Sequence, residues 1–320
     1  MHIGSAMQYY QEALALGSKT GMSLVSDVSP GQIDRLYKTL WKAVFIFEKR
    51  FSRFLPSSEL SEFNRKSGLK QSISPEFRDI LLAAKGMAQK TSGLYNPFVL
   101  PLVQSVGYKY SRVPGHETDV VDDHSDKLLT TADKLIIGDD WAQIPYGTAI
   151  DLGGCGKGYL ADLVANQLPE NIKGYWLSFG GDIALGGHDD SGRPWTVKVE
   201  SAANSASNIA QITTDDVQAV ATSGTIVHRG KKAAGAWHHL IDPRTRRPAE
   251  TDILLATVCD GSALNADVLA SCAVILGSKK GLQFLKKHGV KAAVIQCRND
   301  HNEAQIFKFG DSVKIGESHA

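Results

Sequence analysis

The sequence predicts a single domain of the α+β class, a mixed α/β fold with antiparallel-rich sheets and flanking helices. Strand-like runs that form hairpins are interrupted by long helical runs, which argues against a doubly wound parallel sheet. A glycine-rich stretch matches neither G-x-G-x-x-G nor G-x-x-x-x-G-K-[ST], so neither a Rossmann dinucleotide site nor a P-loop is supported. The chain has 320 residues, of which 42% are hydrophobic, enough for a full core. We expect the domain to span residues 31–320, after an N-terminal segment of residues 1–30.

The composition excludes several classes of function. The formal net charge is only +1, so we expect no nucleic-acid partner, and any phosphate site must be local. No apolar run reaches the roughly 18 residues of a membrane span, and residues 1–21 lack the basic and apolar regions of a signal peptide. We therefore expect a cytoplasmic protein, or a periplasmic or membrane-anchored one if a leader has been removed.

The cysteines are widely separated and form no C-x-x-C pair, which argues against structural zinc and against a disulfide framework. They are Cys155, Cys259, Cys272 and Cys297. We expect them to be small buried residues, with Cys155 as the one candidate for a thiol beside a ligand.

Helical periodicity begins early in the chain. Residues 33–51 place apolar side chains on one stripe and should form a helix packed on the core. Pro56 then ends regular structure, and Ser57 or Ser58 can cap a short helix over residues 59–64.

A second long helix is predicted over residues 75–90. Gly93, Pro97 and Pro101 follow it and forbid a continuous helix. Residues 108–140 are polar and acidic, and we expect a surface excursion with no chemistry.

The stretch over residues 149–161, A-I-D-L-G-G-C-G-K-G-Y-L-A, joins a strand-like run to a helical run. Its glycines could adopt backbone angles closed to other residues and let an anion approach the peptide N–H groups. Lys157 would add charge, and a helix over residues 157–168 would favour phosphate at its N-terminus. The alternative is a tight strand-to-helix turn without a ligand.

Strand-like runs dominate the following part. Residues 174–187 form a strand that breaks at residues 180–182 and resumes, and residues 195–200 alternate as another strand after a turn. Residues 218–224 and 237–242 also form strands, and we expect these two to pair.

The C-terminal part mixes both element types. We expect a strand over residues 254–259, a buried helix over residues 263–277 that ends at glycine, and a short helix over residues 279–288. Residues 292–297 should form the last strand.

Asp267 and Ser271 lie four residues apart on the predicted buried helix, so their oxygens face the same side one turn apart. With backbone carbonyls from neighbouring loops, they could form an oxygen-only site for a hard cation such as Mg²⁺. A capped or solvated helix face is the alternative for this pair taken alone.

An ordered set of blocks resembles the ApbE family of FAD:protein FMN transferases. The blocks are S-R-F-L-P-S-S-E-L-S-E-F-N, S-G-L-Y-N-P-F-V-L-P-L-V, D-L-G-G-C-G-K-G, F-G-G-D-I, A-T-S-G, H-H-L-I-D-P-R-T and A-D-V-L-A-S. The resemblance spans about residues 51–281. It implies an ApbE-like domain with an FAD cleft, and Mg²⁺-dependent transfer of FMN from FAD to a Thr or Ser hydroxyl of a flavin-acceptor protein, with release of AMP.

The resemblance also implies site residues. The metal ligands would be the Asp267 carboxylate, the Ser271 hydroxyl and the backbone oxygens of Gly156 and Ala270. The contacts to the flavin nucleotide would come from Phe54, Leu94, Tyr95, Asn96, Gly153, Lys157, Tyr159, Gly181, Asp182, Ser223 and Ile241.

Three features depart from the family pattern. Asn96 stands where the family usually has Asp, which changes the proton pattern toward a ligand. Arg246 replaces the glycine of a D-P-x-T-G-x-P turn and would be strained if that turn needs a positive φ. The N-terminal I-G-S-A-M-Q only loosely matches the family's M-G-T segment.

Nucleotidyl transfer needs mostly charge neutralisation and positioning. Mg²⁺ and Lys157 would supply the first, and His239, directly before L-I-D-P, is our choice of base for the incoming hydroxyl. On a strand, His238 would point to the opposite face.

Two other functions stay open from the sequence. An FAD pyrophosphatase would use water as the acceptor, giving FMN and AMP. A non-catalytic flavin-binding protein would keep the pocket but has no need of a base such as His239.

Overall fold

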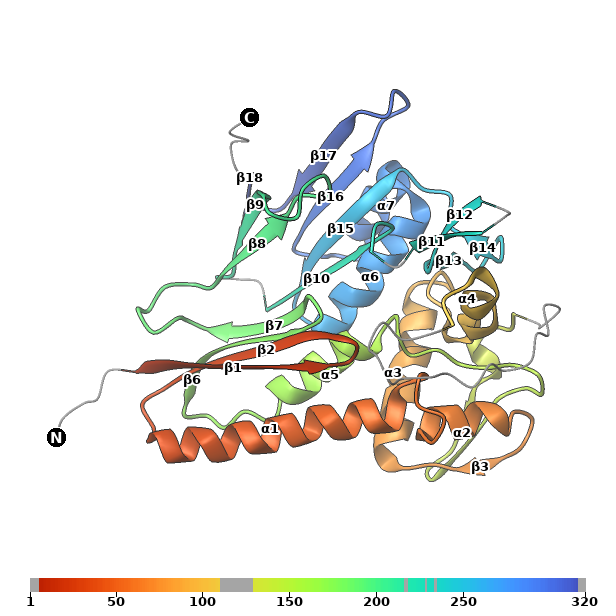
Figure 1. The fold of residues 1–320 in the computed structure, drawn as a ribbon, viewed down its shortest axis with the longest axis horizontal. Helices are drawn as coiled ribbons and strands as arrows, with labels where there is room; N and C mark the ends of the chain where they lie inside the picture. The colour runs from red at the N-terminus through yellow and green to blue at the C-terminus, as the bar shows by residue number, and fades with distance from the viewer. Residues whose placement is uncertain (1–5, 110–128, 216–217, 228, 233–234, 316–320) are drawn as a thin grey trace.

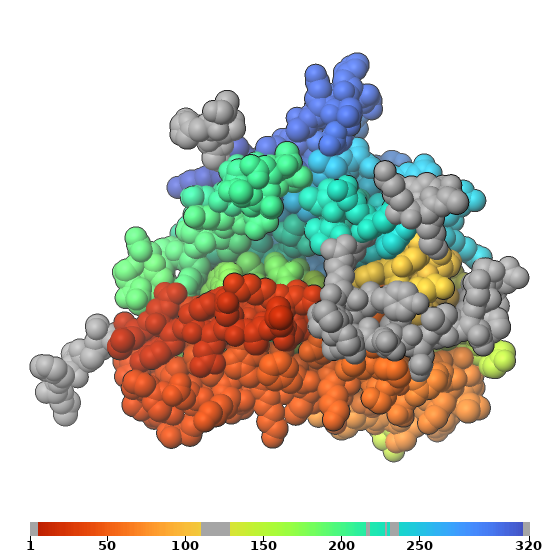
Figure 2. Space-filling model, viewed as in Figure 1, coloured from red at the N-terminus to blue at the C-terminus, as the bar shows by residue number. Residues whose placement is uncertain are grey.

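We analysed a computed structural model of the chain, which describes residues 6–109, 129–215, 218–227, 229–232 and 235–315. Figure 1 shows a broad sheet with helices packed against it and a helical layer beside it. Figure 2, from the same side, shows that the N-terminal third forms the lower part of the molecule and the C-terminal half the upper part. No helix of the described ranges is long and apolar enough to cross a bilayer.

The main sheet has eight strands, and each described pairing in it is antiparallel. In spatial order the strands are β1 (Met7–Ala15), β2 (Ser18–Ser26), β6 (Ile172–Phe179), β7 (Asp182–Gly187), β10 (Ala219–Gly224), β15 (Ile253–Asp260), β16 (Ala292–Arg298) and β17 (Ala304–Phe309). This architecture confirms the predicted α+β class with antiparallel-rich sheets.

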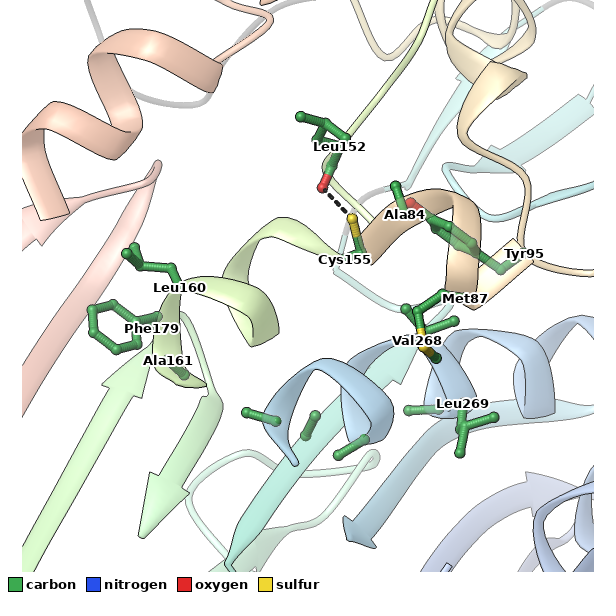
Figure 3. Packing of buried hydrophobic residues seen from close by; sticks show 14 of the residues in the cluster. Ala84, Met87, Tyr95, Leu152, Cys155, Leu160, Ala161, Phe179, Val268 and Leu269 are labelled. Carbon is green, nitrogen blue, oxygen red and sulfur yellow. Dashed lines mark hydrogen bonds between the residues drawn. The ribbon is translucent and has the colours of Figure 1, made fainter. Parts of the chain in front are cut away.

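The long helices bury one face of this sheet. They are α1 (Pro30–Phe51), α5 (Gly156–Ala165), α6 (Ala263–Leu276) and α7 (Ser278–Lys287). Helix α6 packs on β10 and β15 and is apolar nearly all round, as expected for a helix inside a core. Gly277 ends it with a φ of 78°, which confirms the predicted glycine stop. Figure 3 shows side chains of α5, α6 and their neighbours in this core.

A smaller helical layer lies beside the sheet. It contains α2 (Glu59–Arg65), α3 (Pro75–Lys90), η1 (Pro97–Val99), α4 (Leu100–Val106) and η2 (Ala132–Lys134), with a short sheet of β3 (Gln71–Ser72), β5 (Trp141–Gln143) and β4 (Ile136–Ile137). Ser58 Oγ accepts from the Ser61 N–H at 3.0 Å, so Ser58 is the predicted cap of α2. The expected surface excursion falls largely on residues 110–128, which lie outside the described ranges.

A three-stranded sheet covers part of the other face. Its strands are β8 (Thr196–Glu200), β9 (Asn208–Thr213) and β18 (Val313–Ile315), in the order β18-β9-β8. Alternate residues Val197 and Val199 of β8 are buried with Trp195 in a second hydrophobic cluster against the main sheet. Two short hairpins complete the fold: β11 (Arg229–Lys232) with β12 (Gly235–His238), and β13 (Ile241–Asp242) with β14 (Arg247–Pro248).

The structure corrects two predictions of strand arrangement. The strands predicted over residues 218–224 and 237–242 do not pair, because β10 has β7 on one side and β15 on the other. The second run is broken into β12 and β13, each paired within its own hairpin. Residues 292–297 are not the last strand either, since β17 and β18 follow.

The N-terminal residues belong to the main sheet. Residues 7–26, which fall within the N-terminal segment expected over residues 1–30, form β1 and β2. Strand β2 pairs with β6 from Thr20 to Ser26, so these residues are part of the same folded unit as the rest of the chain.

Candidate active site

A cavity of about 1110 Å³ opens where loops from both ends of the chain meet. The turn after α1, the loop before η1, the glycine-rich stretch, the β6–β7 turn, the end of β10 and helix α6 all contribute to its wall. The predicted site residues that line it are Phe54, Leu94, Tyr95, Asn96, Gly153, Gly156, Lys157, Gly181, Ser223, His239, Ile241, Asp267 and Ser271. The structure thus brings together residues that are more than 200 positions apart.

Three predicted site residues are not among those that line the cavity. The Tyr159 ring stacks on Phe47, with the centroids 6.2 Å apart. Asp182 lies behind Lys157 with only 1% of its surface exposed. Ala270 is fully buried inside α6, so only its carbonyl could reach a ligand.

Side-chain and backbone hydrogen bonds hold the glycine-rich stretch in shape. Asp151 Oδ1 accepts from the Gly153 N–H at 2.8 Å, and the Leu152 carbonyl accepts from Gly156 N–H at 2.7 Å as α5 begins. None of its four glycines has a positive φ, so the unusual backbone angles expected there are absent. Gly158 is required for a different reason: an added Cβ would lie 2.4 Å from the Ala263 carbonyl oxygen of α6.

The close approach of α5 and α6 places Asp267 beside the glycine-rich stretch. Asp162 of α5 accepts from Ser262 Oγ at 2.7 Å and from the Ala263 N–H at 2.8 Å, so it caps α6 from the neighbouring helix. Sequence reasoning missed Asp162, and the only available signal was its place directly after the glycine-rich stretch, five residues after Lys157.

Two buried carboxylates and one ammonium form the charged centre of the site. Lys157 Nζ contacts the Asp182 carboxylate, and the Asp267 carboxylate accepts from the Gly158 N–H at 3.2 Å while only 3% exposed. Burial and the nearby Asp267 charge raise the pKa of Asp182 despite Lys157. Burial alone would lower the pKa of Lys157, but Asp182 and Asp267 raise it, so its ammonium is fully charged at neutral pH.

The surroundings of Asp267 fit a hard cation. Lys157 provides one positive charge for two buried carboxylates, those of Asp182 and Asp267. One negative charge is therefore left without a counterion, which favours the binding of a further cation. Ser271, one turn along α6, shares a hydrogen bond of 2.8 Å with Ser223 Oγ of β10, which adds two hydroxyl oxygens. The described residues contain no cluster of three or more His, Cys, Asp or Glu side chains, so carbonyls or ligand oxygens would have to complete a Mg²⁺ shell.

The proposed carbonyl ligands differ from these side chains. Gly156 and Ala270 both lie within helices, where a carbonyl oxygen accepts from the N–H four residues on. Each oxygen keeps a second lone pair, so a metal contact there stays a prediction.

An arginine in the cavity wall lies against two aromatic rings. The Arg53 guanidinium lies 4.2 Å from the Phe54 ring centroid and 4.7 Å from that of Tyr108. Arg53 Nε is 3.4 Å from Asp151 Oδ2, and Nη2 donates to the Tyr108 carbonyl at 3.1 Å. Only 6% of the Arg53 side chain is exposed.

The side chain of Asn96 makes two hydrogen bonds that hold the loop before η1. Its amide donates to the Thr130 carbonyl at 2.8 Å, and its Oδ1 accepts from the Phe98 N–H at 3.0 Å, capping η1. A carboxylate could not make the first bond, so this structure uses the amide that replaces the usual Asp. One amide hydrogen and one lone pair are left for a ligand.

The two neighbouring histidines have different surroundings. His239 follows β12 and lines the cavity, with its ring edge-on to Tyr108 at 5.9 Å. His238 is turned to the Ala249 carbonyl, 2.9 Å from its Nε2, and does not line the cavity. Burial lowers the pKa of His238. Of the two histidines, therefore, only His239 faces the cavity.

The turn after Ile241 is strained, as predicted for an arginine at its glycine position. Arg246 has a φ of 60°, a region that side chains other than glycine rarely adopt. The Arg246 N–H donates to the Asp242 carbonyl at 2.8 Å, while Arg244 pairs with the Asp242 side chain at 2.7 Å. These bonds hold the turn that carries Ile241 to the cavity.

The four cysteines are buried and unbridged, which confirms the expectation for them. Burial raises the pKa of Cys155 to about 12, so its thiol is neutral and does not act as a nucleophile. Its Sγ lies 3.6 Å from the Leu152 carbonyl (Figure 3).

Comparison with known proteins agrees with the fold. The chain is 26% identical over 276 residues to the FAD:protein FMN transferase of Vibrio cholerae, covering 84% of this chain and 79% of the relative. It is 27% identical over 251 residues to the enzyme of that name from Salmonella typhimurium, covering 76% and 72%. Among solved structures, the apo flavinyl transferase ApbE of Pseudomonas stutzeri matches with a TM-score of 0.80 at 21% identity, over 98% of this chain and 97% of that chain.

A second solved structure, the flavin transferase ApbE from Vibrio cholerae, matches with a TM-score of 0.78 at 24% identity, over 96% of this chain and 98% of that chain. At these identities the two structures support the fold alone. The sequence profile of the ApbE family matches residues 16–295, which includes every predicted site residue. The chain therefore belongs to the ApbE family.

Proposed function

We propose that this protein is an FAD:protein FMN transferase that moves FMN from FAD to a Thr or Ser hydroxyl of an acceptor protein and releases AMP, with Mg²⁺ as its cofactor. The relatives named for this activity cover most of the chain. The observation that carries the proposal is the buried group of Lys157, Asp182 and Asp267 beside a cavity of about 1110 Å³. Such a cavity is large enough for a dinucleotide.

The charges suit a pyrophosphate. Lys157 borders the cavity in the first turn of α5, where backbone N–H groups and the helix dipole also favour an anion. Asp182 holds the ammonium in place from behind. A Mg²⁺ ion held by Asp267 and Ser271 would neutralise phosphate charge there.

His239 supplies the proton acceptor in this scheme. The reaction joins the acceptor hydroxyl oxygen to the FMN phosphorus and breaks the bond from that phosphorus to the bridging oxygen, which leaves on AMP. The hydroxyl proton goes to the imidazole of His239, which lines the cavity.

The aromatic and apolar side chains of the cavity wall would bind a ring system of the nucleotide. Phe54 presents its face next to Arg53, and Leu94, Tyr95 and Ile241 add an apolar lining. Flat apolar walls with few polar groups are typical of nucleotide pockets.

The test uses the pure protein with FAD and Mg²⁺, with and without a flavin-acceptor domain. A mass gain of one FMN on the acceptor, with an equal amount of AMP, supports transfer. AMP and free FMN in both reactions would instead support hydrolysis by water. FAD that binds without any AMP release would leave a non-catalytic binder and reject the enzyme.

A further inference from the structure

Arg53 carries a polar group that the fold leaves unused. Its side chain is 6% exposed, it lines the cavity, and its Nη1 has no hydrogen-bond partner in the described part of the chain. A buried donor without a partner is costly, so such a group in a cavity wall points to a ligand atom. The other two nitrogens are engaged, by Asp151 and by the Tyr108 carbonyl.

The guanidinium cannot easily turn away from this position. It lies against the rings of Phe54 and Tyr108, at 4.2 and 4.7 Å from their centroids, and it is fixed at two of its three nitrogens. The orientation of the remaining Nη1 is therefore set before a ligand arrives.

The net charge around Arg53 determines which kind of ligand acceptor suits a hydrogen bond from its Nη1. Asp151, with only 12% of its side chain exposed, neutralises the guanidinium. Asp151 is itself held by the Gly153 N–H at 2.8 Å. A neutralised donor beside aromatic rings suits a neutral acceptor in a flat ring, whereas the phosphate charge is matched by the ammonium of Lys157.

We propose that Arg53 Nη1 donates a hydrogen bond to a ring carbonyl or ring nitrogen of the bound flavin nucleotide and so selects its ring orientation. This inference rests on the proposed FAD site. The acceptor atom belongs either to the isoalloxazine ring or to the adenine ring, because both rings carry neutral acceptors in their plane. Arg53 is a specificity-determining residue that does not take part in the chemical step.

The test compares the parent protein with Arg53→Lys, which keeps a positive charge for Asp151 but lacks both Nη atoms. Titrations use FAD, FMN, ADP and inorganic pyrophosphate. We expect Arg53→Lys to weaken FAD about tenfold, and to weaken only one of FMN and ADP by the same factor, with pyrophosphate unchanged. The half-ligand that responds identifies the ring. Arg50→Gln, a surface change on α1 in an exposed pair with Glu76, is the matched control and should change no affinity.

Asp151→Asn provides a second variant that leaves Arg53 itself in place. Asn keeps an acceptor for the Gly153 N–H but removes the charge, so pyrophosphate should bind more tightly while the ring contact persists. Equal weakening of pyrophosphate and the half-ligands by Arg53→Lys would mean a phosphate contact and overturn the proposal. So would unchanged affinity for all four ligands. If the proposed function itself is wrong, the parent protein will not bind FAD, so this case can be told apart from both of these results. If Arg53→Lys does not fold, an Asp151→Asn protein that binds pyrophosphate no better than the parent overturns the proposal.

Discussion

Replacing Lys157 should damage both stability and FAD binding, and a second substitution should separate the two effects. In Lys157→Met, the Asp182 carboxylate, only 1% exposed, loses its ammonium partner. Removing one member of a buried pair costs about 3–5 kcal/mol. Because 32% of the Lys157 side chain is exposed, we expect the lower end, about 3 kcal/mol, in the free energy of unfolding.

The double variant Lys157→Met/Asp182→Asn removes the stranded charge and should recover most of that loss, since an unpaired buried charge causes it. FAD affinity should not recover, because the phosphate loses a charge-assisted bond in both variants, roughly 1–3 kcal/mol or about 5- to 150-fold in Kd. Urea unfolding measures the first quantity and FAD titration the second.

Lys173→Met is the matched control. Lys173 pairs with Asp27 at 2.6 Å on the surface, with side chains 50% and 40% exposed, so its loss should cost less than about 1 kcal/mol. The reasoning is refuted if Lys157→Met unfolds at the same urea concentration as the parent, or if the double variant is as unstable as the single one.

Three further outcomes follow from the same site. His239→Ala should slow FMN transfer about 10²- to 10⁴-fold with FAD affinity nearly unchanged; a larger loss of transfer in His238→Ala would contradict the assignment. Asp267→Ala should abolish Mg²⁺-dependent activity while circular dichroism stays helical, and unchanged Mg²⁺ dependence would reject the metal site. Burial lowers the pKa of His238 below 6.5, so its contribution to stability is complete above pH 6.5 and is lost as the pH falls below it. His238→Gln should unfold with a smaller acid dependence below about pH 6.5, and an identical dependence would show that another group causes the effect.

Local signals in the sequence were sufficient for most of the helices. Helix α4 (Leu100–Val106) was not predicted, and Pro101 stands in its first turn, where proline is tolerated. Ser58 and Ser74 cap α2 and α3 by accepting backbone N–H bonds within three residues, and Gly277 ends α6. These interactions join near neighbours in the chain, so residue type and spacing predict them. The ordered blocks likewise predicted the family, and with it the common cavity that gathers most of the site.

Strand pairing could not be predicted from local signals in the sequence. The partner of β10 was predicted wrongly. A strand pairs with the segment that the fold places beside it, and for β10 that segment is Ile253–Asp260 and not the nearer residues 237–242. Residues 7–26 became part of the main sheet through β6, more than 140 positions away. Pairing between distant strands is decided by the packed arrangement as a whole.

The sequence by itself determined the class of fold, most of the helices, the family and the side chains available for chemistry. Only the tertiary structure decided how those side chains act. Lys157 is held by Asp182 across 25 residues, Arg53 is neutralised by Asp151 across almost a hundred, and Gly158 is needed because α6 crosses it. The physical reason is that burial and the neighbouring charges set the free energy of an ionic group, and both exist only once distant segments have packed together.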